Sequence, residues 1–213
     1  MKYFIDIFPA LISGTGMTLL VFIGTLIGAL PLGVLFAFAL KSKFKPLVYL
    51  LNLYIWVMRG TPLLLQLIFV FYGLPMIGIT FERMDAALFA FILNYAAYFA
   101  EIFRGGINSI PQGQYEAAKV LRLSKFQTSL KVVFPQVFKV VLPSVCNEVI
   151  TLVKDSSLIY VIGLGDLLRA GKIAMSRDVS IVPMIAVAVV YLVLIGILTI
   201  LQKRIEKKFS YYK

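Results

Sequence analysis

Long apolar stretches separated by short polar ones divide the chain into five candidate membrane-crossing segments. A helix needs about 20 predominantly apolar residues to cross the hydrocarbon core of a bilayer. The pattern therefore predicts an all-α integral membrane protein with one domain over 1–213 and one long polar loop, 104–136. The expected transmembrane helices cover about 14–40, 61–79, 86–103, 137–162 and 181–201.

The first apolar run is too long for the core of a signal peptide, which is about 7–15 residues, so we expect it to be retained. Residues 3–12 before it form either a short interfacial helix or a lead-in to the first crossing. Small residues recur four apart inside the run, at Gly24 and Gly28 and again at Ala29 and Gly33. Such pairs allow two helix backbones to approach closely.

The second run is interrupted between two apolar stretches by Met58-Arg59-Gly60-Thr61-Pro62. We favour a helix start here, with Thr61 as N-cap and Pro62 in the first turn, and an interfacial segment before it. The alternative is that Gly60 and Pro62 bend or unwind the helix, which would suit a moving or gating element.

Composition agrees with a membrane protein and excludes several classes of site. Hydrophobic residues make up 61% of the chain and charged residues 15%, and the mean hydropathy is +0.94. The chain has no histidine and a single cysteine, Cys146. We therefore expect no histidine-based catalytic or zinc site, no internal disulfide and no metal centre. The phosphate-loop pattern G-x-x-x-x-G-K-[ST] is also absent, so we expect no ATP site of that kind in this chain.

The charge distribution predicts the orientation. The 21 basic residues outnumber the 10 acidic ones, for a net charge of +11. Most of the basic residues lie in 41–59, 104–139 and the C-terminal tail, whereas the cations of the other connections are balanced by acids. The positive-inside rule then places the N-terminus outside and the C-terminus in the cytoplasm. The excess charge suits anionic lipid, and we do not expect nucleic acid as a partner.

The polar loop has its own helical pattern. Residues 115–121 combine strong helix formers with a small Ala-Ala face. Ser124 is suited to cap a second helix that would end before Pro135. Two short helices at an angle would form a knob able to dock into a partner; the alternative is an amphipathic loop lying on the membrane.

This loop resembles the EAA loop of ABC importer permeases. The family pattern is E-A-A-x3-G-x9-I-x-L-P, and here Glu116-Ala117-Ala118, Arg122 and Val132-Val133-Phe134-Pro135 follow its spacing. Other stretches resemble the polar amino acid subfamily of these permeases, and together the resemblance covers most of 14–205. These stretches are Arg59 to Gln66, Ala100 to Ile107, Gly113-Gln114, and Lys154 to Leu158 followed by Ile162-Gly163.

The resemblance implies a bacterial, multi-pass plasma-membrane permease subunit that imports polar amino acids. It also implies several partners: an ATPase subunit dimer holding ATP and Mg, a second permease copy or paralogue, and an extracytoplasmic substrate-binding protein. The residues implied in coupling to the ATPase are Glu116, Ala117, Ala118, Lys119 and Arg122. The family has glycine at the last of these positions, in a turn where a positive φ is expected. A side chain there costs about 1–2 kcal/mol if the left-handed conformation is kept, so either the turn is rebuilt or the strain is tolerated.

Polar residues inside the expected spans are candidates for the substrate pathway, because such residues are expensive in a membrane and usually functional. Helical spacing places Glu148, Thr151 and Asp155 on one face, near the midplane. The full candidate set is Asn147, Glu148, Thr151 and Asp155 on the fourth span and Tyr98 and Glu101 on the third. Two structural alternatives are open: Glu101 pairing with Arg104, and Asp155 making a contact at a dimer interface.

The acidic character of this set slightly favours basic amino acids, such as arginine, as substrates. An ion-coupled secondary transporter or channel, with Glu148 and Asp155 as ion sites and no ATPase partner, is the alternative. A membrane enzyme is a third possibility, but no nucleophile–base pair is evident.

Overall fold

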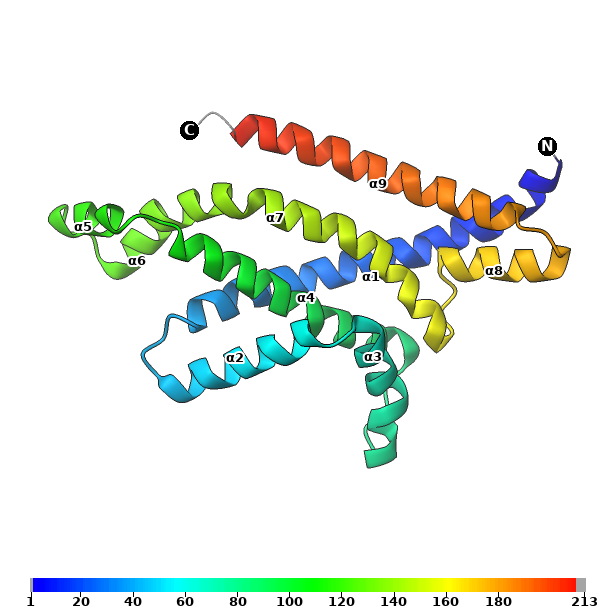
Figure 1. The fold of residues 1–213 in the computed structure, drawn as a ribbon, viewed down its shortest axis with the longest axis horizontal. Helices are drawn as coiled ribbons and strands as arrows, with labels where there is room; N and C mark the ends of the chain where they lie inside the picture. The colour runs from blue at the N-terminus through cyan, green and yellow to red at the C-terminus, as the bar shows by residue number, and fades with distance from the viewer. Residues whose placement is uncertain (1, 210–213) are drawn as a thin grey trace.

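The computed structural model describes residues 2–209, with side chains from residue 6 onward, and this part of the chain contains helices and connections but no strand (Figure 1). The helices are α1 (Lys2–Ala39), α2 (Lys45–Gly60), α3 (Leu63–Ile68), α4 (Arg83–Asn108), α5 (Gln112–Val120), α6 (Lys125–Thr128), α7 (Phe134–Asp155), α8 (Leu167–Asp178) and α9 (Val182–Phe209). Short π-helical stretches follow α3 (Phe69–Gly73) and α6 (Ser129–Val133), and 3-10 stretches cover Leu74–Ile77 and Ser156–Ile162.

Four helical segments of the described chain are long and apolar enough to cross a bilayer by themselves. They are Asp6–Ala39, Arg83–Asn108, Lys125–Ile162 and Val182–Phe209. A fifth crossing is formed if Lys45–Gly60 and Leu63–Ile77, which are bent by 104° at their junction, count as one span. The two small helices α5 and α6 lie at one end of the bundle, and α8 lies at the other end beside the start of α1 (Figure 1).

The core is built around α4, which α1 contacts along much of its length. Small residues permit this close approach of α1 to α4, as the Gly24/Gly28 and Ala29/Gly33 pairs predict. A Cβ added at Gly33 would lie 2.5 Å from the Cβ of Phe99, and one at Gly28 would lie 2.6 Å from a methyl of Ile92. Helices in a membrane gain stability from such close van der Waals packing, because lipid provides no hydrophobic driving force between them.

The second crossing differs from the straight span expected over 61–79. α2 ends at Gly60, Thr61 is extended (φ −121°, ψ 147°), and α3 begins after Pro62. Pro62 lacks an N–H and its ring disfavours helical geometry at the preceding residue, so the helix breaks here. Thr61 does not cap α3; its hydroxyl donates instead to the carbonyl of Val57, at 2.8 Å. The chain therefore bends at Gly60 and Pro62, and the helix start at Thr61 that the pattern favours is wrong.

The polar loop agrees with the expected pattern at its turn and differs at its end. Ser124 caps α6 in a capping box with Gln127, and Arg122 has φ +57°. The second helix does not end before Pro135. It continues through the π-helical stretch Ser129–Val133 into α7, where Pro135 lies in the first turn. The π stretch provides the extra residue that accommodates the proline without breaking the helix.

Candidate functional site

A cavity of about 380 Å³ lies where the break between α2 and α3 faces α4 and the end of α7. Its polar lining comes from three separate parts of the chain, so it exists only in the folded molecule. The lining residues are Thr61, Pro62, Leu63, Leu64, Asn94, Tyr95, Tyr98, Glu148, Thr151, Asp155 and Leu158. A concave site with a few converging polar groups is the usual form of a small-molecule site.

The two carboxylates of the cavity lie two turns apart on α7. Glu148, Thr151 and Asp155 are spaced so that one helix face carries all three. Asp155 accepts a hydrogen bond of 2.7 Å from the Tyr95 hydroxyl. Within the described residues, neither Glu148 nor Asp155 has an ion-pair partner within 4 Å. The lining is therefore acidic and suited to groups that carry positive charge.

The wall opposite α7 is held in place by amides. Asn94, which is buried, donates to the carbonyl of Met58 and to the side-chain oxygen of Gln66, both at 3.0 Å. Gln66 donates to the same Met58 carbonyl at 2.9 Å and to the Thr61 hydroxyl at 2.8 Å. These bonds satisfy backbone carbonyls that the helix break leaves open, which an apolar environment requires.

Four of the expected pathway residues meet in this cavity: Tyr98, Glu148, Thr151 and Asp155. Asn147 is not among its lining residues, because it lies about 100° around α7 from Glu148. Its side-chain oxygen instead accepts a hydrogen bond of 3.2 Å from Gln202 on α9.

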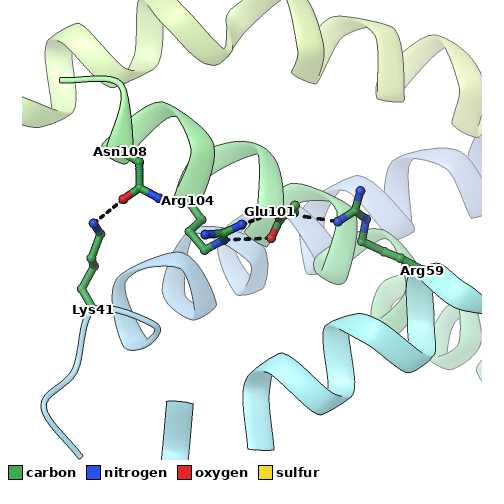
Figure 2. Close-up of polar contacts among 5 residues, drawn as sticks. All are labelled: Lys41, Arg59, Glu101, Arg104 and Asn108. Carbon is green, nitrogen blue, oxygen red and sulfur yellow. Dashed lines mark hydrogen bonds and ion pairs between the residues drawn. The ribbon is translucent and has the colours of Figure 1, made fainter. Parts of the chain in front are cut away.

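Glu101 also lies outside the lining. It accepts two hydrogen bonds from the guanidinium of Arg104, as the structural alternative anticipates. Figure 2 shows Glu101 between Arg104 on one side and Arg59 on the other. The cluster adjoins the cavity through Tyr98, since the guanidinium carbon of Arg59 is 5.4 Å from the centre of that ring.

Sequence reasoning missed the part of the lining that the helix break supplies. A straight second span would not turn Thr61 to Leu64 toward α7. The spacing of Asn94 and Tyr98 on one side of α4 was an available signal for the wall. Tyr95 gave no signal of its own, because its hydroxyl partner Asp155 lies 60 residues away.

The expected coupling residues lie at the α5 end of the bundle, far from the α8 end (Figure 1). Glu116, Ala117 and Lys119 are exposed, whereas Ala118 is buried at 2% exposure. The expected Ala-Ala face is therefore shared: one alanine packs inward and the other faces outward. Large apolar side chains also lie exposed beside them, namely Val120, Leu121 and Phe126. Exposed apolar side chains of this kind suit contact with a protein or with lipid.

Known proteins resemble the chain over nearly its whole length. It is 39% identical to the arginine transport system permease protein ArtQ of Bacillus subtilis, over 95% of this chain and 93% of that protein. It is 35% identical to the putative glutamine transport system permease protein GlnP of Rickettsia conorii, over 97% of each. The L-cystine transport system permease protein TcyB of Bacillus subtilis is 34% identical, over 96% of this chain and 88% of that protein.

Solved structures agree with the fold. A chain of an amino acid ABC transporter crystallised with histidines matches with a TM-score of 0.90 at 34% identity, covering 96% of both chains. A chain of the MetNI methionine ABC transporter matches with a TM-score of 0.70 at 19% identity, over 98% of this chain and 97% of that one, and supports the fold alone.

The family model described as "binding-protein-dependent transport system inner membrane component" matches residues 29–211. A match of this extent, together with relatives named as amino acid permeases, settles the family and the setting. The protein is a multi-pass plasma-membrane permease, a translocation subunit rather than an enzyme. The chain belongs to the family of inner membrane components of binding-protein-dependent transport systems, within the amino acid ABC transporter permeases.

Proposed function

We propose that this chain carries polar amino acids, with a preference for basic ones such as arginine, into the cytoplasm by ATP-driven alternating access. The observation that carries the proposal is the cavity at the helix break. Its lining includes Glu148 and Asp155 but no Lys or Arg. A basic amino acid brings two cationic groups, one for each carboxylate, whereas a neutral amino acid brings one.

The orientation proposed from the charges places α5 and α6 in the cytoplasm. There Glu116, Ala117 and Lys119 would contact an ATPase subunit, one for each permease, with ATP and Mg held on that ATPase. Exposed Val120, Leu121 and Phe126 support this docking role, because they extend the charged surface of α5 with apolar area. Arg122 has a left-handed conformation in the turn between α5 and α6.

Two copies of the permease, or one copy and a paralogue, would complete the pathway. The α9 crossing supports this arrangement. Only 6% of its most apolar stretch is buried within the chain, so most of that helix surface is free to contact a second subunit or lipid. An extracytoplasmic substrate-binding protein would deliver the amino acid at the α8 end. Family membership favours this account over the ion-coupled transporter or channel, which would leave the α5 surface without a partner.

Co-purification with the candidate ATPase tests the proposal. We expect a stable complex whose ATP hydrolysis rises when arginine and the binding protein are added. Glu116→Arg reverses a charge on the exposed face of α5 and should disrupt the complex. Lys203→Glu, on the exposed last part of α9, is the matched charge-reversal control and should leave it intact. The coupling role would be contradicted if the ATPase did not associate with the unmodified chain. It would also be contradicted if Glu116→Arg left the complex intact.

A further inference from the structure

A second cavity, of about 460 Å³, lies between the end of α1 and the segment that leads from α6 into α7. It shares no lining residue with the polar cavity between α3, α4 and α7. Four of its six lining residues are large apolar side chains that are between 36% and 74% exposed. The lining residues are Phe38, Lys125, Phe126, Ser129, Leu130 and Phe134. A groove lined in this way is suited to an apolar ligand.

The inner wall of this groove is closed. Phe38 and Phe134 also bound a small enclosed space together with Phe103, Val133 and Val137. Each of these last three side chains is at most 6% exposed. Packing of this density leaves no route from the groove into the interior of the bundle. A ligand of the groove would therefore enter from the surroundings of the protein and not from the proposed substrate pathway.

Both sides of the groove belong to candidate membrane crossings. Phe38 lies in the last turn of the Asp6–Ala39 crossing, and Leu130 and Phe134 lie in the first part of the Lys125–Ile162 crossing. The orientation proposed from the charges places both of these ends at the cytoplasmic leaflet. The groove is thus placed where the acyl chains of that leaflet meet the protein.

The rim of the groove is basic. Lys125 lines it directly, and Lys41 follows Phe38 in a tight turn in which the Lys41 N–H donates to the Phe38 carbonyl at 3.0 Å. The amine of Lys41 donates to Asn108, which is neutral and leaves the charge uncompensated (Figure 2). Within residues 6–209, neither these two lysines nor Lys43 has an ion-pair partner within 4 Å. The rim is therefore suited to an anionic group.

We propose that the groove binds one anionic phospholipid of the cytoplasmic leaflet. An acyl chain lies along Phe38, Leu130 and Phe134, and the phosphate accepts hydrogen bonds from the Lys125 amine. Lys41 and Lys43 add positive potential at the same rim. Basic pockets between crossings on the cytoplasmic side commonly recognise lipid headgroups in this way. The inference does not depend on which substrate the polar cavity carries.

Two other occupants are distinguishable from an anionic lipid. Any bilayer lipid could fill the groove, with the long side chain of Lys125 reaching to the headgroup level without selecting a headgroup. Alternatively, the surface of a partner subunit could cover the groove, in which case no lipid would reach it. The first occupant shows no headgroup preference, and the second excludes lipid altogether.

Fluorescence quenching by brominated lipid tests these occupants at the groove itself. The chain has a single tryptophan, Trp56. Trp56→Phe combined with Leu130→Trp moves that reporter into the groove, and Trp56→Phe alone gives the background from other subunits. The permease–ATPase complex is placed in nanodiscs of a neutral lipid, and brominated phosphatidylglycerol or brominated phosphatidylcholine is added. We expect half-maximal quenching at an about fivefold lower fraction of the anionic lipid, as for one lysine beside an anionic headgroup.

Lys125→Gln in the reporter background should bring the two lipids close to equal, whereas Lys125→Arg should keep the preference. Lys131→Gln is the matched control, because Lys131 is an exposed cation on the same segment that does not line the groove. It should leave the preference unchanged. Phe126→Trp, at a side chain that is 74% exposed, is a second reporter if Leu130→Trp does not assemble.

Equal quenching by the two lipids in the starting reporter protein would overturn the anionic preference. Quenching by neither lipid would overturn lipid as the occupant and would indicate a covering subunit. An equal loss of preference in Lys125→Gln and Lys131→Gln would overturn a local site, because it would reflect the general surface potential.

Discussion

Single residues carry both the chemistry and the local strain of this permease. Glu148, Thr151 and Asp155 share one face of α7, and this grouping could be predicted from helical spacing alone. The neighbouring Asn147 could not be placed in the same way. A polar stripe indicates which residues share a face, but it does not indicate that Gln202 of α9 lies against one edge of that stripe.

Replacing Glu148 by glutamine removes one of two negative charges in the cavity with almost no change in shape. We expect Glu148→Gln to lower the affinity for arginine by about tenfold and to change the affinity for glutamine little, because only the basic substrate needs both carboxylates. Asn147→Ala, one position away and directed at α9, is the control and should change neither affinity. Equal losses for arginine and glutamine would argue against a charge-based preference. Binding to the purified permease provides the measurement.

Val179 is a β-branched residue in the left-handed region, with φ +48° at the end of α8. Its side chain is 93% exposed, so glycine at this position would lose almost no packing. We expect Val179→Gly to stabilise the protein by up to about 1 kcal/mol, because the strain is relieved. Val189→Gly, in the interior of α9 with φ in the ordinary range, should be destabilising by roughly 0.3–0.5 kcal/mol, because glycine is a poorer helix former than valine. Thermal unfolding in detergent compares the two, and a lower midpoint for Val179→Gly would contradict the strain argument.

At the scale of elements, some local signals were reliable, whereas the Thr61 cap and the helix end before Pro135 were wrong. The Ser124 cap depends on a few neighbouring residues, so the sequence predicts it. The positive φ of Arg122 was expected only from the resemblance, because the family has glycine at this position. The bend between α2 and α3 depends on Asn94, which is 36 residues from the Met58 carbonyl that it binds. Without that partner in view, the pattern favours a helix start at Thr61 over the bend that the structure has.

The bend should fail when its amide clamp is removed. Gln66→Leu keeps the side-chain volume but leaves the carbonyls of Met58 and Thr61 with one donor fewer, at a cost of about 1–3 kcal/mol. We expect a lower thermal midpoint and weaker arginine binding together, because the same bend forms the cavity wall. Leu65→Ala, on the exposed side of α3, is the control for a local substitution. Unchanged stability and binding in Gln66→Leu would show that the clamp is dispensable.

The start of α8 gives stability a specific pH dependence. Asp166 is fully buried outside the candidate spans and caps α8 by accepting from the N–H groups of Leu168 and Arg169. Burial raises the pKa of Asp166 above its ordinary value, although the two backbone hydrogen bonds act in the opposite direction. The folded state therefore holds this proton more tightly than the unfolded state does. Its contribution to stability is fully present below the unfolded pKa and is lost as pH rises through the raised pKa.

Asp166→Asn should remove that contribution and keep the cap, so the decline in stability between about pH 4 and the raised pKa should become flatter. Thermal midpoints measured across this range report the effect. Asp85→Asn replaces an exposed carboxylate in the first turn of α4 and is the matched control. A profile for Asp166→Asn that parallels the unmodified protein would contradict the burial argument.

At the scale of the whole molecule, the proposed substrate cavity and the proposed coupling surface are joined by one continuous segment. The helix that begins at Lys125, in the α5–α6 knob, continues to Ile162 and carries Glu148 and Asp155 on the way. A rigid element of this kind can transmit movement of the knob to the cavity. Pro135 does not interrupt this segment, because the π-helical stretch before it preserves the connection.

The measurement that tests the account most directly is a cryo-EM map of the permease complex with arginine bound. The account predicts arginine density in the cavity between α3, α4 and α7, with its cationic groups at Glu148 and Asp155. An arginine found at another site, with this cavity empty, would contradict it.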